Sequence, residues 1–210
     1  MASIYELKPT FQRLLKPLLV LLAGLKISPN QITLSALFLS LCGGILIGNA
    51  AFQPELLLAM PLILFIRMAL NALDGMLARE YQQSTPLGEI LNEVGDIVSD
   101  AVLYLPLMFL YPESMIIVFQ IGLLALLASL SEFSGVLTKT MTGLRRYDGP
   151  MGKSDRAFAI SFFCLAQYFL PALSHALIIP FLAMLNGLLI LSCCNRLKPA
   201  LKGESYGKTA

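Results

Sequence analysis

The sequence predicts an all-α integral membrane protein, a six-transmembrane-helix bundle with an N-terminal amphipathic juxtamembrane segment. Of the 210 residues, 57% are hydrophobic and 13% are charged, whereas soluble domains carry about 25% charged residues. Apolar stretches close to the roughly 20 residues that cross a hydrocarbon core recur along the whole chain. Short connections separate these stretches, so we expect a single membrane domain with no soluble domain attached.

Six apolar stretches define the predicted spans, and the fifth of them is the shortest. They cover residues 33–51, 56–78, 87–111, 114–137, 157–170 and 173–194. The predicted bundle occupies residues 28–196, between a juxtamembrane segment at residues 1–27 and a cytoplasmic tail at residues 197–210.

The segment at residues 1–27 contains positively charged residues interspersed with leucine and phenylalanine. The positively charged residues are Lys8, Arg13, Lys16 and Lys26. This pattern is typical of a basic amphipathic segment that lies at the membrane surface, and Pro17 predicts a break in it. A simple flank to the first span explains the residues equally well and lies on the same side of the membrane.

Positive charge falls on one side of the predicted bundle. With six spans, every lysine and arginine except Arg67 lies at a terminus or in a loop on that side. The opposite loops carry Glu55, Glu113 and His175. Because cytoplasmic loops are enriched in lysine and arginine, we expect both termini in the cytoplasm.

Residues 71–101 concentrate acidic side chains on two predicted helices. They hold six of the thirteen carboxylates, namely Asp74, Glu80, Glu89, Glu93, Asp96 and Asp100. An ionised carboxylate in the hydrocarbon region costs several kcal/mol unless it pairs, meets water or holds a cation. Arg67 alone does not balance so many acids, so the sequence predicts a bound divalent cation.

The spacing of the polar residues places oxygen atoms on two facing helix surfaces. Asn71 and Asp74 are three residues apart, and Asn92, Asp96 and Asp100 recur every four residues, so each set shares one helix face. Hard oxygen ligands of this kind suit Mg²⁺, Mn²⁺ or Ca²⁺ rather than zinc.

The run N71-x2-D74-G75-x2-A78-R79-x8-G88-x3-N92-x3-D96 resembles the signature of the CDP-alcohol phosphatidyltransferases, D-x2-D-G-x2-A-R-x8-G-x3-D-x3-D. Every spacing is intact, and both departures replace Asp by Asn. The stretch S28-P29-N30-x2-T33 is similar to a Pro-Asn-x-x-Thr segment of the same family. A bacterial branch similar to phosphatidylglycerophosphate synthases shows the same Asn-for-Asp pattern.

The resemblance implies a function and a setting. Family members move a phosphatidyl group from CDP-diacylglycerol to a small alcohol and release CMP. It further implies Mg²⁺ (or Mn²⁺) as the cofactor, surrounding membrane lipids, a homodimer and no nucleic-acid partner. The expected location is the bacterial inner (cytoplasmic) membrane, with the active site on the cytoplasmic side.

The resemblance also assigns roles to individual residues. The metal shell would contain Asn71, Asp74, Asn92 and Asp96, with Asp96 also the catalytic general base and with Glu93 and Asp100 restoring some of the missing negative charge. The CDP moiety would contact Asn30, Thr33, Gly75, Ala78, Arg79, Thr85 and Gly88. For Arg79, a role as a positively charged membrane anchor is the alternative.

Three alternatives remain open from the residues. The second acidic pair of the signature can be shifted one turn onto Asp96 and Asp100, although the intact spacing from Gly88 to Asn92 favours the first register. The two asparagines can mark a catalytically altered or inactive family member. Acids in membrane helices also occur in cation transporters, but these more often place them near mid-membrane on broken helices.

A basic loop at residues 145–157 lies on the same predicted side as the acids. Its cations are Arg145, Arg146, Lys153 and Arg156, which we interpret as a site for an acceptor that carries phosphate, such as glycerol 3-phosphate. Contact with anionic lipid is the alternative. Glu132, in the fourth span, is expected either to face the same cavity or to pair with Arg67.

Overall fold

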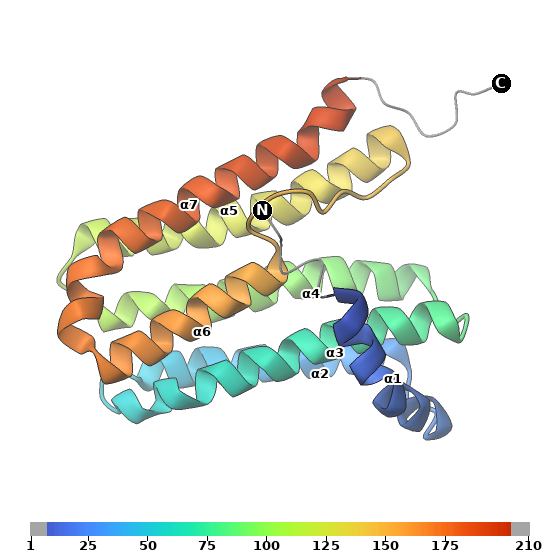
Figure 1. Cartoon of the computed structure of the whole chain (residues 1–210), viewed down its shortest axis with the longest axis horizontal. Coiled ribbons are helices and arrows are strands. Elements are labelled where there is room, and N and C mark those ends of the chain that lie inside the picture. Colours follow the sequence, from blue (N-terminus) through green and yellow to red (C-terminus); the bar gives the residue numbers. More distant parts are fainter. Residues whose placement is uncertain (1–7, 203–210) are drawn as a thin grey trace.

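The computed structural model describes residues 8–202, and every regular element in that range is helical (Figure 1). The α-helices are α1 (Lys8–Gly24), α2 (Pro29–Asn49), α3 (Met60–Glu80), α4 (Pro86–Tyr104), α5 (Met115–Thr142), α6 (Lys153–Phe169) and α7 (Pro171–Leu201). Two 3₁₀ helices, η2 (Pro54–Ala59) and η3 (Leu105–Leu110), precede α3 and follow α4. The prediction of an all-α protein is confirmed.

Six helical segments follow α1 in the predicted order, and four of them are long and apolar enough to cross a membrane. These are Pro29–Asn49, Pro54–Glu80, Met115–Thr142 and Pro171–Leu201. Helix α6 has 17 residues, fewer than the roughly 20 that a span needs, and α4 carries four carboxylates. Membrane crossing by α4 and α6 therefore stays a prediction.

The two ends of the chain differ from the predicted pattern. Helix α1 continues through Pro17, so the predicted break there is wrong. The helix survives the lost hydrogen bond because its apolar side packs on the bundle, where Leu19 is buried together with Leu73 and Leu77. Helix α7 runs through Pro199 into the predicted tail, and the calls on residues 1–7 and 203–210 lie outside the described residues.

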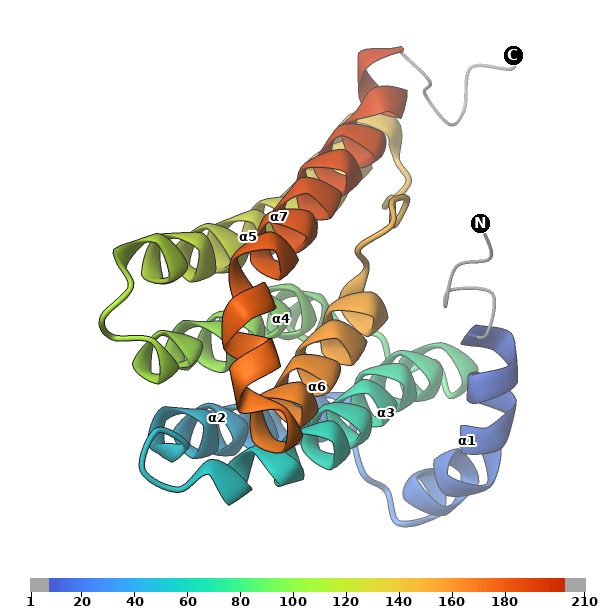
Figure 2. The same ribbon diagram turned by 60° about the vertical axis from the view of Figure 1, so that its left-hand side comes forward.

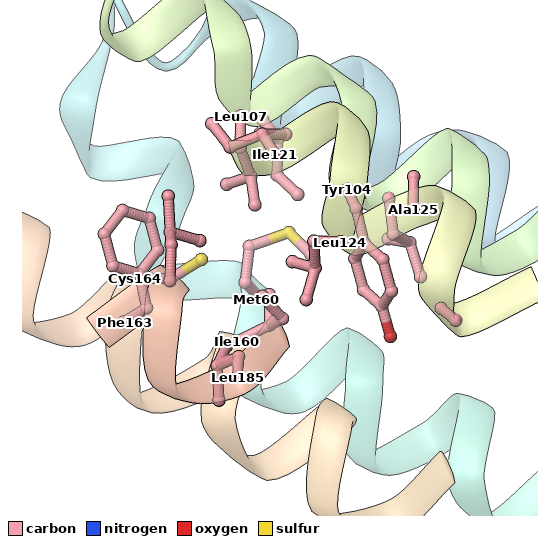
Figure 3. Close-up of a cluster of buried hydrophobic side chains, with 14 of the residues drawn as sticks. Met60, Tyr104, Leu107, Ile121, Leu124, Ala125, Ile160, Phe163, Cys164 and Leu185 are labelled. Atoms are coloured by element: carbon pink, nitrogen blue, oxygen red, sulfur yellow. The ribbon is translucent and has the colours of Figure 1, made fainter. Parts of the chain in front are cut away.

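The helices form two packed groups that α6 connects. Helices α5 and α7 lie along each other, and α2 packs against both α3 and α4 (Figures 1 and 2). Helix α6 contacts α3 on one side and α7 on the other. The central apolar core draws Met60, Tyr104, Ile121, Phe163 and Leu185 from five different helices (Figure 3).

Large apolar side chains also cover the outside of the bundle. Phe38, Phe119, Phe158 and Leu191 are exposed on four different helices. Apolar surface of this extent is unfavourable against water and suits contact with lipid chains. The exposed surface thus agrees with the membrane class that the composition predicts.

The polar N-termini of α2 and α4 are fixed by their own capping residues. The Ser28 hydroxyl accepts a hydrogen bond from the Gln31 backbone N–H (3.3 Å), and the Gln31 side chain accepts one from the Ser28 N–H (2.8 Å). At α4, the Thr85 hydroxyl accepts from the Gly88 N–H (3.0 Å). A proline follows each cap, where its missing N–H costs nothing. These caps begin both helices at the same end of the bundle.

Close packing of α2 on α4 depends on Gly44. A Cβ atom at this position would lie 2.1 Å from the Val102 carbonyl oxygen, a backbone atom that cannot turn aside. The two helices therefore approach each other backbone to backbone at this point, and this approach sets how the polar ends of α2 and α4 face each other.

We expect Gly44→Ala to lower the stability of the protein by about 1–3 kcal/mol, because the added methyl group overpacks the interface. The measurement is the thermal unfolding midpoint in detergent micelles. Gly187→Ala is the matched control, since nothing lies within 4 Å of its added Cβ and alanine favours a helix by up to about 1 kcal/mol. Equal midpoints for the two variants would contradict the proposed packing role of Gly44.

Candidate active site

Two cavities open at the end of the bundle where α2, α4 and α6 begin. The larger, about 370 Å³, lies between α3 and α6, with α1 beside it, and is called the α3–α6 cavity. The other, about 310 Å³, lies between α2, α3 and α4 and is called the α2–α4 cavity. The two share Gly75, Arg79, Asn92 and Tyr147 as common wall residues. They are thus adjacent chambers of one site.

The α2–α4 cavity gathers every residue that the resemblance assigns to the CDP moiety. Its lining includes Asn30, Thr33, Gly75, Ala78, Arg79, Thr85 and Gly88. A Cβ at Gly88 would lie 2.8 Å from the Asn30 side-chain oxygen and 3.1 Å from the Thr85 hydroxyl. Glycine at this position therefore leaves both polar groups accessible from the cavity.

Asp74 carries an unpartnered oxygen at the wall of the α2–α4 cavity. The residue is 3% exposed, and its Oδ2 accepts a hydrogen bond of 2.8 Å from the Thr33 hydroxyl. Its Oδ1 is buried and has no hydrogen-bond partner among residues 8–202. A buried carboxylate oxygen without a donor is costly, so this atom is suited to bind a cation.

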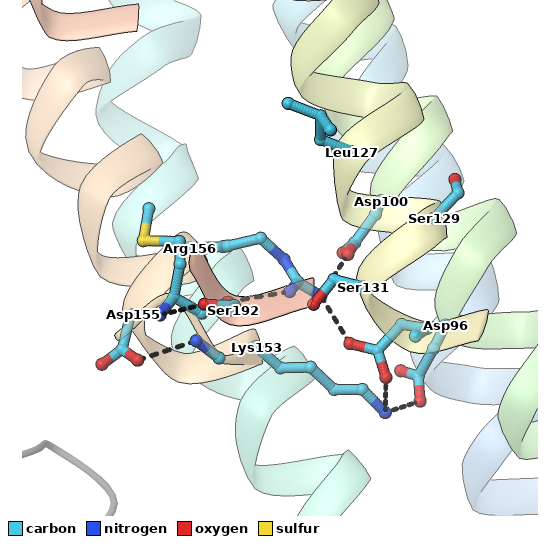
Figure 4. A network of polar contacts seen from close by, with 12 residues as sticks. Asp96, Asp100, Leu127, Ser129, Ser131, Lys153, Asp155, Arg156 and Ser192 are labelled. Carbon is cyan, nitrogen blue, oxygen red and sulfur yellow. Dashed lines mark hydrogen bonds and ion pairs between the residues drawn. The ribbon is translucent and has the colours of Figure 1, made fainter. Parts of the chain in front are cut away.

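Asp96 differs because protein groups occupy both of its oxygens. Oδ1 accepts a hydrogen bond of 3.1 Å from the Asn71 side-chain amide, and the Lys153 ammonium group bonds Oδ2 (Figure 4). An Arg67 nitrogen lies 3.8 Å from Oδ1. Asn71 and Lys153 line the α3–α6 cavity, with Asp96 behind them.

Asp100 and Glu93 are paired with arginines. Asp100 is 1% exposed and binds Arg67 at 3.0 Å and Arg156 at 2.7 Å. Glu93 lines the α2–α4 cavity and pairs with Arg145, while its Oε2 has no partner in the described part of the chain. Of these two predicted ligands, Glu93 is therefore the one within reach of the cavity.

Glu132 lies at the centre of a buried ion-pair network that sequence reasoning missed. Arg145 lies 2.8 Å from its carboxylate, Arg156 3.0 Å, Arg196 3.6 Å and Lys153 3.7 Å. Of the two alternatives drawn from the sequence, the structure supports the cavity, because Glu132 lines the α3–α6 cavity. No signal in the sequence links Glu132 to Arg196, since helix packing alone brings α5 and α7 together.

The expectation that the chain itself lacks the positive charge to balance these acids is wrong. Lys153 and Arg156 come from α6, and Arg145 from the loop before it; together with Arg67 they neutralise Asp96, Asp100 and Glu93. The acids lie on α4, whereas three of these counter-ions come from α6 and the loop before it, which only helix packing brings close. The need for a divalent cation now depends on Asp74.

The four residues predicted to bind the acceptor do not line one cavity, although Arg145, Lys153 and Arg156 share Glu132. Lys153 lines the α3–α6 cavity and Arg145 the α2–α4 cavity. Arg156 is 1% exposed and held by Asp100 and Glu132, while Arg146 pairs with Asp148 at 4.0 Å.

Arg145 also contacts Tyr147, one of the residues that both cavities share. Its guanidinium lies 4.9 Å from the centre of the Tyr147 ring. Burial lowers the pKa of Arg145, while Tyr147 raises it and Arg196 lowers it. Because a guanidinium ionises far above neutral pH, Arg145 remains charged.

The donor set fits a divalent cation in part. Within residues 8–202, no group of three His, Cys, Asp or Glu side chains is placed to hold a metal ion. Asp74 offers a free carboxylate oxygen, and Asn71 and Asn92 add amide groups on the walls of the cavities. An amide oxygen is a hard ligand without charge, so the fit is strongest at Asp74.

Sequence comparison connects the chain to one family and to bacterial relatives. The family model of the CDP-alcohol phosphatidyltransferases matches residues 26–191. The inner membrane protein YnbA of Escherichia coli K12 is 51% identical over 169 residues, which cover 80% of this chain and 82% of that protein. An uncharacterized protein of Aquifex aeolicus is 36% identical over 97 residues, which cover 46% and 47%.

Solved structures of a phosphatidylinositol phosphate synthase from Mycobacterium tuberculosis share the fold. The structure with CDP-DAG bound has a TM-score of 0.72 at 19% identity and covers 90% of this chain and 94% of that one. The complex with manganese and citrate has a TM-score of 0.70 at 19% identity, with 88% of each chain covered.

We expect Glu132→Gln to destabilise the protein by about 3–5 kcal/mol, because it leaves several buried cations without their shared carboxylate. The unfolding midpoint in detergent should fall by roughly 10 °C. Glu89→Gln is the matched control, since Glu89 forms an exposed pair with Lys139 and such pairs contribute about 0–1 kcal/mol. A similar small shift for both variants would show that the network around Glu132 is not stabilising.

Proposed function

Because the chain belongs to the CDP-alcohol phosphatidyltransferase family, we propose that it transfers the phosphatidyl group of CDP-diacylglycerol to a small alcohol. In this reaction the alcohol oxygen attacks the phosphorus that carries the diacylglycerol group. A new P–O bond forms, the bond to CMP breaks, and the hydroxyl proton passes to a base. The observation that carries the proposal is the α2–α4 cavity, where all seven predicted nucleotide contacts meet beside the free oxygen of Asp74.

The α2–α4 cavity has the chemistry to hold a nucleotide diphosphate. Arg79 presents a planar set of donors that matches phosphate oxygens, and Asn30 and Thr85 offer further polar atoms beside Gly88. A structural neighbour with CDP-DAG bound supports this choice of donor substrate. Apolar side chains cover the bundle outside the cavities, so the acyl chains of the donor would remain in the lipid.

A divalent cation, Mg²⁺ or Mn²⁺, completes the proposed site. Asp74 would hold it, with the amide oxygens of Asn71 and Asn92, and the manganese in a neighbour's crystal structure supports this type of ion. Such a cation neutralises phosphate charge and stabilises the leaving group.

Asp96 is the proposed general base. Its carboxylate would take the proton of the acceptor hydroxyl, a role that contributes about 10²–10⁴-fold to a rate. Asn71 and Lys153 hold the two oxygens of this carboxylate and orient it. Both residues line the α3–α6 cavity and Asp96 lies behind them, so an alcohol bound there would reach Asp96 between these two side chains.

The charge of the α3–α6 cavity favours an acceptor that carries phosphate. Its lining holds four cations and two carboxylates: Arg67, Arg79, Lys153, Arg196, Glu132 and Asp155. Cations outnumber carboxylates in this lining, and such a surface attracts an anion. Glycerol 3-phosphate is an acceptor of this class.

The proposed setting is the bacterial inner membrane, with both termini and the active site in the cytoplasm. The relative at 51% identity is an inner membrane protein of Escherichia coli. Six lysines and arginines line the two cavities at one end of the bundle, as expected of a cytoplasmic face: Arg67, Arg79, Lys139, Arg145, Lys153 and Arg196. A homodimer is the proposed assembly.

We expect the purified protein to release CMP from CDP-diacylglycerol when the acceptor alcohol is present, and Asp96→Asn to slow this release by about 10²-fold or more. Labelled CDP-diacylglycerol would be followed into CMP and new lipid across a panel of alcohols. Glu113→Gln, exposed at the opposite end of the bundle, is the control and should match the unchanged protein. Equal rates in the Asp96 variant would exclude the base, and no release with any acceptor would exclude the transferase.

We expect Lys153→Gln to raise the KM for a phosphorylated acceptor by roughly tenfold, since a hydrogen bond to a charged group contributes about 1.5–3 kcal/mol. Lys198→Gln is the matched control, because Lys198 is exposed at the same end and contacts Asn195 rather than either cavity. Initial rates over a range of glycerol 3-phosphate concentrations would measure both. The same KM in the two variants would remove Lys153 from acceptor binding.

A further inference from the structure

The two aspartates that the signature retains have unlike surroundings. Asp74 keeps one buried oxygen without a hydrogen-bond partner in the described range, and the donors beside its carboxylate, the Thr33 hydroxyl and the Gly75 backbone N–H, are neutral. Asp96 has an amide donor on one oxygen and an ammonium group on the other. One carboxylate is therefore open to a cation, while the other already has one.

Asn71 is part of the difference between the two aspartates. It stands where the family signature has Asp, and its amide N–H donates to Asp96. An ionised aspartate at this position has no proton to donate and would repel Asp96. The Asn therefore allows Asn71 and Lys153 together to satisfy both oxygens of Asp96.

Positive charge around Asp96 also opposes a metal ion there. The Lys153 ammonium group bonds Oδ2, and an Arg67 nitrogen lies 3.8 Å from Oδ1. A divalent cation on the same carboxylate would lie within a few ångströms of both cations. At such distances like charges repel by several kcal/mol in the partly desolvated interior.

We propose that the Lys153 ammonium group takes the place of a metal ion at Asp96, so that the chain holds a single divalent cation, at Asp74. The inference rests on the proposed function, because it assigns the charges of that same site. It gives the two asparagines a common explanation. Compared with the family signature, the site has two fewer negative charges, and the ammonium group of Lys153 stands where one divalent cation would otherwise be needed. Lys153 then acts as a resident cation that positions Asp96.

The test counts bound metal and requires no turnover. Purified full-length protein in detergent is titrated with Mn²⁺, alone and with CMP, and free Mn²⁺ is followed by its electron paramagnetic resonance signal. We expect one bound Mn²⁺ per chain in the unchanged protein. Lys153→Met removes the ammonium group at nearly the same length, and we expect it to bind a second Mn²⁺.

Two variants keep the test decisive. Lys153→Arg preserves the charge and should bind a single Mn²⁺, whereas Asn71→Asp combined with Lys153→Met restores a carboxylate and should bind two. Lys198→Met, an exposed lysine outside both cavities, is the matched control and should behave as the unchanged protein. Elution from a sizing column checks that each variant is folded.

The outcomes separate this inference from the proposed function. Two Mn²⁺ in the unchanged protein, or none, would overturn it, as would a single Mn²⁺ in both the Lys153→Met variant and the double variant. Release of CMP is measured on the same preparations. If the unchanged protein releases CMP but binds two Mn²⁺, the transferase activity stands and the proposed role of Lys153 in place of a metal ion is wrong. If it binds a single Mn²⁺ and never releases CMP, the proposed transferase activity is wrong.

Discussion

The carboxylate of Glu132 is the charge around which the polar half of the bundle is assembled. It is 1% exposed and lies within ion-pair distance of Arg145, Arg156 and Arg196, which belong to the loop before α6, to α6 and to α7. A charge buried this deeply is tolerated only when it is paired and hydrogen-bonded. Each of these segments must therefore reach one point, and this requirement restricts how α5, α6 and α7 pack together.

The network passes from Glu132 to the catalytic candidates through Arg156. That guanidinium also binds Asp100, which lies one helical turn from Asp96 on α4. The orientation of α4 thus depends on an ion pair with α6, and Lys153, three residues before Arg156, meets Asp96 as a consequence. One set of buried charges positions α4, and the same set supplies the cation that contacts Asp96.

A different kind of contact forms the α2–α4 cavity. Here the absence of a side chain at Gly44 lets α2 approach α4 closely, and the caps at Ser28 and Thr85 begin both helices at the cavity. Thr33 then reaches Asp74 on α3. Close apolar packing thus produces a chamber whose wall carries the cation Arg79 and the unpartnered carboxylate oxygens of Asp74 and Glu93, among the described residues.

The sequence by itself determined the helices, their order and the residues that line the α2–α4 cavity. Helical periodicity and the short signature carry this information, because contacts three or four residues apart follow from helix geometry alone. Only the tertiary structure decided the counter-ions: Lys153 for Asp96, Arg156 for Asp100 and Arg196 for Glu132. Each of these pairs joins different helices, and no local rule specifies which cation meets which acid. Burial decides it, because a charge inside the bundle must find its partner across the packed helices.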